Sequence, residues 1–287
     1  MKLVRVGEPG AEKPAVAVSE EHYVDVSDRI TDYDSAFFAS DGHRELGALV
    51  RQRIDSGAVE PLAGRRLGPP IARPHQILCI GMNYAEHALE SGAAVAAEPV
   101  IFNKAPNCIS GPHDDIIRPR GSEKLDYEVE LGVVIGTRAR YLSDDEAAAA
   151  AIGGYLAVND VSERAFQLER CGQWVKGKSC ESFNPCGPYL VTPDEIGDPQ
   201  DLQLWLTVNG EKRQASSTRH MVFGVVEIIR YLSHFMVLEP GDLINTGTPS
   251  GVALGCEERG YLRDGDVVEL GITGLGTQRN QVVERKE

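Results

Sequence analysis

The chain has 287 residues, 42% of them hydrophobic and 25% charged, which is the composition of a soluble globular protein with one large domain or two unequal ones. Its formal charge of −14 argues against a nucleic-acid or anionic-membrane partner, and no apolar run approaches the ~20 residues that span a bilayer. Six cysteines without C-x-x-C spacing predict free thiols, and the start of the chain lacks a signal-peptide core, so we expect a cytoplasmic location.

The first part of the chain is predicted to form a small N-terminal domain over residues 1–70, followed by a catalytic domain over residues 71–287. Short strands are expected at 2–6 and 14–18, and a helix over 34–54 in which Gly42 permits a break. The proline-rich run 67–74 is the expected connector.

A histidine and a glutamate follow the first strand of the second domain. This strand is predicted at 76–81, and a short helix at 84–91 ends before Gly92. His87 and Glu90 are three residues apart and therefore share a helix face, where a carboxylate can raise the basicity of an imidazole. Taken alone, an ordinary surface pair is the favoured interpretation of this spacing.

Two glutamates lie in the apolar run 124–135, which is predicted to be one strand. Glu128 and Glu130 point to the same side of that strand because successive side chains alternate. Two adjacent carboxylates repel each other, and a hard divalent cation with oxygen ligands would remove the repulsion. A solvated strand face is the commoner explanation of an isolated E-x-E pattern.

A third carboxylate is expected beside this pair. A capping box at 143–146 begins an alanine-rich helix that is predicted to end at Gly153 and Gly154, and the strand 155–158 then leads to Asp160. The two strands of such a unit are commonly neighbours, which would bring Asp160 next to the glutamates. Three carboxylates suit Mg²⁺, whereas the lack of histidine in the set argues against zinc or copper.

The remaining segments supply candidate polar groups. Residues 161–168 are expected to begin a helix on which Arg164 and Gln167 share a face, and 172–179 to form a glycine-flanked loop with two lysines that lacks P-loop spacing. Thr248 lies in a polar loop over 246–251, whose alternative interpretation is a simple turn. The other expected elements are a hairpin at 202–210, a helix at 218–236, and strands at 243–245, 267–272 and 281–283.

Five motifs, in this order, resemble those of the fumarylacetoacetate hydrolase family: Gly81-Met-Asn-Tyr-Ala-Glu-His87, Asp126-Tyr-Glu-Val-Glu-Leu131, Asn159-Asp-Val-Ser162, Lys178-Ser179 and Thr246-Gly-Thr-Pro249. The resemblance covers residues 75–275. It implies an α+β, β-rich fold, with a mixed β-roll or sandwich as the catalytic domain, a divalent metal and a homodimer.

The resemblance also implies a role for each candidate residue. The implied metal ligands are Glu128, Glu130 and Asp160, with Mg²⁺ as the expected ion and Mn²⁺ or Ca²⁺ as alternatives. His87 and Glu90 would activate water, and Lys178 would stabilise an enolate. The implied substrate-binding residues are Gln167 and Thr248, together with Arg164, which shares the face of Gln167.

One departure narrows the substrate. The animal fumarylacetoacetate hydrolase has a fourth carboxylate ligand at the position where this chain has Ile80, which argues against fumarylacetoacetate itself. The chain is more similar to a bacterial branch that includes hydrolases of 2,4-diketo-3-deoxy-L-rhamnonate and L-fuconate. We therefore predict cleavage of the C3–C4 bond of a 2,4-diketo acid to pyruvate and a second acid.

Other functions fit the same residue set. A metal-bound 2-oxo acid could instead undergo decarboxylation, as for oxaloacetate, or tautomerisation, or dehydration of a 2-oxo-3-deoxy sugar acid. Outside the enzymes, the carboxylates could form a structural Ca²⁺ site. The pair formed by His87 and Glu90 favours hydrolysis, because a positioned base can activate water.

Overall fold

The computed structural model describes residues 1–40, 42–92, 94–256, 258 and 260–285, and it is β-rich as predicted. Its larger sheet runs, in spatial order, β4 (Glu60–Pro61), β3 (His22–Asp25), β2 (Lys13–Ala17), β1 (Lys2–Val6), β15 (Leu190–Val191), β12 (Ile152–Asn159), β11 (Val129–Ile135), β18 (Leu243–Asn245), β6 (Ile77–Gly81) and β7 (Val100–Lys104), with β5 (Leu67–Gly68) paired to β1. The smaller sheet runs β17 (Glu211–Ser217), β16 (Gln203–Val208), β19 (Val267–Ile272), β20 (Gly276–Glu284) and β9 (Ile116–Arg118). Two short pairs complete the strands, β10 (Leu125–Asp126) with β13 (Ser162–Glu163) and β8 (Ile109–Ser110) with β14 (Asn184–Pro185).

The helices are short and lie around the sheets. They are α1 (Ser35–Ala39), α2 (Gly42–Asp55), α3 (Ala85–Glu90), α4 (Asp145–Ala150), α5 (Arg164–Leu168), α6 (Val175–Lys178) and α7 (Val225–Phe235), with 3₁₀ turns η1 (Pro106–Cys108), η2 (Pro193–Glu195) and η3 (Thr218–His220). In the part of the chain that the structure describes, no helix has the length and apolar character needed to cross a bilayer.

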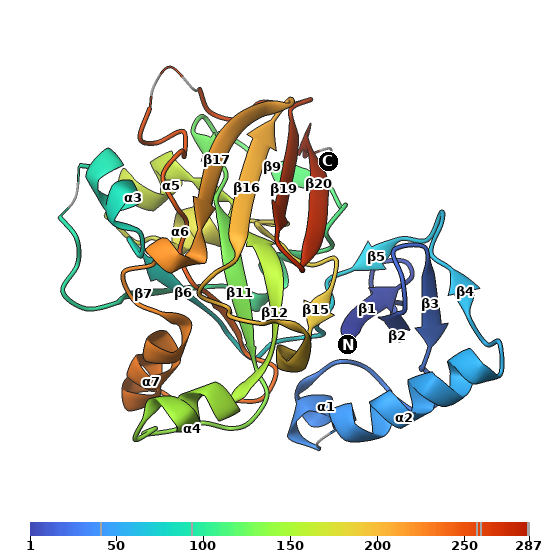
Figure 1. The fold of residues 1–287 in the computed structure, drawn as a ribbon. Helices are drawn as coiled ribbons and strands as arrows, with labels where there is room; N and C mark the ends of the chain where they lie inside the picture. Colours follow the sequence, from blue (N-terminus) through green and yellow to red (C-terminus); the bar gives the residue numbers. More distant parts are fainter. Residues whose placement is uncertain (41, 93, 257, 259, 286–287) are drawn as a thin grey trace.

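Strand β11 lies at the centre of the molecule, and all seven of its residues are buried. It pairs antiparallel with β12 on one side and with β18 on the other, while the smaller sheet packs over β11 and β12 (Figure 1). This burial on both faces explains why the strand is apolar apart from Glu130. The inward side chains of β16, Leu204, Leu206 and Val208, belong to the same core.

The N-terminal elements extend the larger sheet. Strand β1 pairs with β15 through Lys2↔Val191 and Leu3↔Leu190, and β1 to β5 with α1 and α2 form a lobe beside the rest of the chain (Figure 1). The proline-rich run 67–74 begins with β5, which still pairs with β1. The division of the chain at residue 70 stays a prediction.

Several expected elements differ from the observed ones around the candidate site. The run 124–135 is two strands rather than one, because residues 125–126 pair with β13 while 129–135 pair with β12 and β18. Residues 161–168 form β13 before α5 begins at Arg164, and the expected loop 172–179 contains α6.

Two helices also have other ends than predicted. Helix α4 is capped by Asp144, whose side chain accepts the N–H of Ala147, and it stops at Ala150, so Gly153 and Gly154 lie within β12. The expected helix 218–236 is shorter: α7 begins after the cap residue Gly224, and η3 occupies its expected first turn. The strands of the hairpin and the strands β18 and β19 were predicted correctly.

Candidate metal centre and active site

Three buried carboxylates meet where β11 and β12 end. Glu130 belongs to β11, Glu128 directly precedes it, and Asp160 directly follows β12. The ladder pairs Val129 with Asn159, and the Asp160 N–H donates to the Glu128 carbonyl at 2.9 Å, so both ends stay in register. One oxygen from each carboxylate lies within 4.8 Å of the others. The predicted proximity of the three side chains is therefore confirmed.

Two buried lysines contact this cluster. Lys178 Nζ donates to Glu128 Oε2 at 2.7 Å and to Asp160 Oδ2 at 2.8 Å. Lys104 Nζ donates to Asp160 Oδ1 and, at 3.2 Å, to the carbonyl of Val161. Burial alone would lower the pKa of Lys178, but Asp160 and Glu128 outweigh it and raise the pKa to about 12. The ammonium group of Lys178 is therefore held in its charged form.

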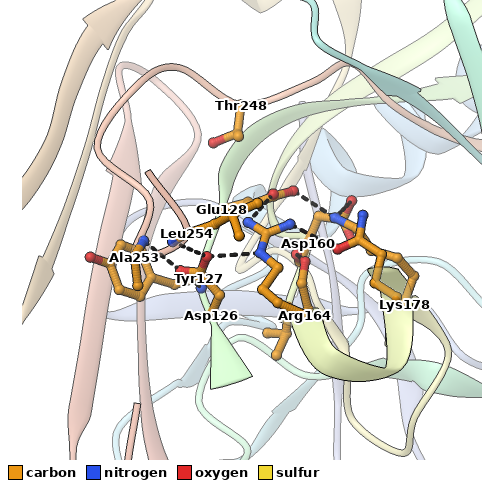
Figure 2. Close-up of polar contacts among 12 residues, drawn as sticks. Asp126, Tyr127, Glu128, Asp160, Arg164, Lys178, Thr248, Ala253 and Leu254 are labelled. Atoms are coloured by element: carbon orange, nitrogen blue, oxygen red, sulfur yellow. Dashed lines mark hydrogen bonds and ion pairs between the residues drawn. The ribbon is translucent and has the colours of Figure 1, made fainter. Parts of the chain in front are cut away.

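Arg164 binds the other side of Glu128 (Figure 2). Its guanidinium donates to Asp126 Oδ2 at 2.8 Å, to Glu128 Oε1 at 2.6 Å and to Gln167 Oε1 at 3.0 Å. Burial alone would raise the pKa of Glu128, but Lys178 and Arg164 hold it well below the usual range. Arg164 thus positions a carboxylate, and because it also lines the cavity described below, its contact with a substrate stays a prediction.

The charged form of Glu130 is not stabilised by neighbouring cations to the extent that the charged form of Glu128 is. Its contact is the backbone N–H of Gly247, which donates to Oε2 at 2.8 Å. Burial, followed by the neighbouring carboxylates of Asp160 and Glu128, raises the pKa of Glu130 well above its usual value. A cation bound by all three carboxylates would offset this repulsion.

The donor set fits a hard divalent cation. All three side chains offer oxygen, and oxygens of Glu128 and Asp160 already converge on one positive centre, the Nζ of Lys178. When Glu130 is ionised, the buried cluster of Asp126, Glu128, Glu130 and Asp160 carries four negative charges against the three cations Lys104, Arg164 and Lys178. The excess of negative charge favours a further cation at Glu130.

His87 lies on α3 and is 5% exposed. Burial lowers the pKa of His87 despite the nearby carboxylates of Glu128 and Glu90, so its imidazole is neutral at neutral pH. Its Nδ1 has no hydrogen-bond partner among the described residues. Both carboxylate oxygens of Glu90 accept the N–H of Gly251 at 3.0 Å, so Glu90 does not bond to Nδ1 of His87 in this structure.

The two other predicted substrate residues are also buried beside the cluster. Gln167 is 4% exposed and accepts from Arg164, as described above. Thr248 donates to the carbonyl of Val129 at 3.0 Å and accepts from Nε2 of Gln214 at 2.9 Å. Gln214 lies on β17, so this contact connects the smaller sheet to the loop that carries Thr248.

A cavity of about 150 Å³ joins these groups. Its polar lining residues are His87, Ser91, Glu128, Glu130, Arg164, Gln167, Lys178 and Thr248, and its other lining residues are Ile80, Gly81, Met82, Phe102, Leu168, Trp174 and Leu254. Ile80, for which the sequence resemblance implies the place of a fourth carboxylate in the animal enzyme, is one of the apolar residues of this lining. Seven of the nine predicted site residues line this cavity. The eighth, Asp160, contacts the lining residue Lys178, and the ninth, Glu90, is on the helix that carries His87.

Sequence reasoning missed two residues of the cluster. Lys104 is fully buried at the end of β7, and Asp126 accepts N–H groups from Ala253 and Leu254 at 2.8 and 3.0 Å as well as the Arg164 guanidinium (Figure 2). The available signal was a charged residue close to apolar strand residues: Lys104 lies two residues after the apolar run 100–102, and Asp126 follows Leu125.

The fold and the site define an enzyme class. The chain belongs to the fumarylacetoacetate hydrolase family, because the family model described as fumarylacetoacetate (FAA) hydrolase C-terminal matches residues 76–283. A curated relative from Sphingomonas sp. (strain SKA58), named 2,4-didehydro-3-deoxy-L-rhamnonate hydrolase, is 44% identical over 99% of this chain and 96% of its own length.

Solved structures agree in fold. The fumarylacetoacetate hydrolase of Exiguobacterium antarcticum superposes with a TM-score of 0.84 at 38% identity, covering 99% of this chain and all of that chain. Maleylpyruvate hydrolase from Sphingobium sp. SYK-6, solved with manganese(II) and pyruvate, gives a TM-score of 0.84 at 26% identity with full coverage of both chains. A structure from Mycobacterium abscessus described as a 2-hydroxyhepta-2,4-diene-1,7-dioate isomerase gives 0.79 at 34% identity, again with full coverage.

Proposed function

We propose that this enzyme is a divalent-metal-dependent hydrolase that cleaves the C3–C4 bond of a 2,4-diketo acid to pyruvate and a second carboxylic acid. The observation that carries the proposal is the convergence of Glu128, Glu130 and Asp160 at the cavity that Lys178 and His87 line together with the two glutamates. The named activity of the Sphingomonas relative supports a 2,4-diketo-3-deoxy sugar acid as the substrate class.

The three carboxylates would hold Mg²⁺, or Mn²⁺ as in the Sphingobium structure. The ion would supply Lewis-acid stabilisation of negative charge on the 2-oxo group of the substrate. Gln167 and Thr248 would hold the substrate carboxylate beside that position, and Arg164 keeps Glu128 in place through its 2.6 Å contact.

His87 supplies the base. Its imidazole is neutral because burial lowers its pKa, and it lines the cavity, so it can take a proton from water as the oxygen attacks C4. The C4–O bond forms, and the C3–C4 bond then breaks with its electron pair remaining on the three-carbon fragment. A proton returns to C3 to give pyruvate, and the acyl fragment leaves as a carboxylate.

Lys178 stabilises the charge that this cleavage creates. Its ammonium group lies between Glu128 and Asp160 and 5.1 Å from the centroid of the Phe102 ring. A positive charge held in a water-poor cavity acts strongly on a developing enolate, because it does not have to reorganise during the reaction. Glu90 would act on His87 only through its charge or after rearrangement, since its oxygens bind Gly251 here.

A second candidate is isomerisation of a 2-oxo acid. The name of the Mycobacterium abscessus structure supports it, and the same base and ammonium group could move a proton without adding water. Decarboxylation and dehydration need the same groups, so the products decide among them. The homodimer and the cytoplasmic location are further proposals that rest on the sequence.

The test is a panel of 2,4-diketo acids with Mg²⁺, followed by loss of enol absorbance and by identification of products. We expect pyruvate and a second acid in equal amounts, and no turnover after EDTA treatment. Glu128→Ala should lose both Mn²⁺ binding and turnover, whereas His87→Ala should keep Mn²⁺ binding and lose hydrolysis. Release of CO₂, a double-bond isomer as the product, or full hydrolysis by metal-loaded His87→Ala would contradict the proposal.

A further inference from the structure

The cavity is lined by both polar and apolar side chains. Its charged groups include Glu128, Glu130 and Lys178, and its apolar lining residues are Ile80, Met82, Phe102, Leu168, Trp174 and Leu254. In a 2,4-diketo acid the charged end would bind the charged groups, which leaves the apolar residues as surroundings for the group beyond C4. The space that these apolar residues leave therefore limits which substrates fit.

Trp174 occupies a fixed position among these apolar residues. A Cβ built on Gly81 would lie 2.8 Å from Cζ3 and 3.2 Å from Cη2 of the indole, so the ring packs directly on the glycine at the end of β6. The indole also packs edge-on against Phe102, with ring centroids 5.2 Å apart and an interplanar angle of 66°. Phe102 in turn lies beneath the ammonium group of Lys178.

The backbone of Trp174 has a separate role. Its carbonyl accepts the N–H groups of Gly177 and Lys178 at 2.9 and 3.1 Å, which forms the single turn of α6. Replacement of the indole leaves this carbonyl in place, so the side chain can be changed without removing these two backbone hydrogen bonds or the contacts of Lys178 Nζ with Glu128 and Asp160. The size of the cavity and the placement of the lysine are therefore separable by mutation.

We propose that the indole of Trp174, packed on Gly81, sets the maximum length of the acyl group beyond C4, and that the enzyme accepts short groups with an apolar end. This inference rests on the proposed hydrolase function. The whole cavity has a volume of about 150 Å³, so the indole occupies space that a longer acyl group would need. An extended chain with many hydroxyl groups would leave those hydroxyls facing aromatic carbon without partners.

The experiment compares kcat/KM for 2,4-dioxopentanoate and 2,4-dioxooctanoate. Wild type should prefer the shorter acid. Trp174→Ala should raise the ratio of kcat/KM for 2,4-dioxooctanoate to kcat/KM for 2,4-dioxopentanoate at least ~10-fold, which is the effect of one methylene group in an apolar pocket. Trp174→Phe should give an intermediate ratio. Trp205→Ala is the matched control, because it removes the other indole of the chain from the outer face of β16, and its ratio should equal that of wild type.

Binding gives a second readout that needs no turnover. Trp205→Phe leaves Trp174 as the single indole, and with Mg²⁺ present its fluorescence should change with 2-oxopentanoate but not with pyruvate, which has no carbon beyond C3. Equal ratios in Trp174→Ala and Trp205→Ala, with cleavage by wild type intact, would overturn this inference alone. Failure of wild type to cleave either acid, with other 2,4-diketo acids of the panel cleaved, would also overturn this inference alone, whereas no cleavage of any panel member would overturn the hydrolase function and the inference with it.

Discussion

Replacement of Arg164 by methionine tests the charge network most directly. The guanidinium is 3% exposed and contacts Asp126, Glu128 and Gln167. Methionine keeps the bulk of the side chain but removes its charge and all three hydrogen bonds. Two buried carboxylates then lose a partner that no water molecule from bulk solvent can readily replace.

The expected loss of stability follows from what remains bonded. Removing one partner of a buried ion pair typically costs about 3–5 kcal/mol, because the other charge is left uncompensated. Here Glu128 keeps Lys178, and Asp126 keeps the N–H groups of Ala253 and Leu254. We therefore expect Arg164→Met to lower the free energy of unfolding by an amount at the lower end of this range, about 3 kcal/mol. Arg164→Lys should recover only part of this, since one ammonium group cannot reach three separated oxygens in the same geometry.

Urea denaturation measures the effect as a shift of the midpoint at constant slope. Arg118→Met is the matched control, because Arg118 binds Asp264 through two contacts of 2.8 and 2.6 Å but lies at the surface. Such an exposed pair is worth about 0–1 kcal/mol. If Arg164→Met loses no more stability than Arg118→Met, the buried network does not stabilise the fold as described.

Three further outcomes are expected. Without metal, Glu130→Gln should unfold at the same temperature as wild type or a higher one, because the substitution removes a carboxylate that its neighbours repel. Mg²⁺ should raise the unfolding temperature of wild type but not that of the variant. An equal rise in both proteins would contradict the role of Glu130 as a ligand. The lowered pKa of His87 keeps its imidazole neutral as pH falls, so the acid limb of kcat/KM should lie below pH 6.5, and a limb above that value would exclude this base. Gly177→Ala places a Cβ 2.4 Å from the Glu163 carbonyl oxygen. This clash should lower the free energy of unfolding by about 1–3 kcal/mol and should lower kcat by moving Lys178. Gly197→Ala is the control, because open space surrounds Gly197 and kcat should stay unchanged.

Local sequence patterns predicted the centre of this molecule well. The apolar run at 129–135 and the strand that ends before Asp160 are both long enough to recognise, and the helix between them indicated that the strands are neighbours. The proximity of Asp160 to the two glutamates follows from that single pairing. The family motifs added the roles of the residues, which spacing alone could not supply.

The contacts that sequence patterns missed join distant parts of the chain. Asp126 accepts from Ala253 and Leu254, which are 127 and 128 residues away, and local periodicity carries no information about such a pairing. In the sequence, Lys104 is indistinguishable from an exposed lysine near the end of a strand. In the structure it is a buried cation that donates to Asp160, which lies 56 residues further along the chain. Helix α6 has only four residues, and it packs against α5 because Gly177 has no side chain, which a propensity argument penalises.

The attachment of β1 to β15 has a practical consequence for protein engineering. Strand β15 touches β12 through the single pair Tyr155↔Val191, so β1 provides most of its lateral hydrogen bonding. A truncated fragment starting near residue 71 would leave the edge of β15 unpaired, and an unpaired strand edge can pair with a strand of another molecule. Such a fragment should precipitate on expression. A chimaera with the N-terminal lobe of another protein would have to keep the pairing between β1 and β15.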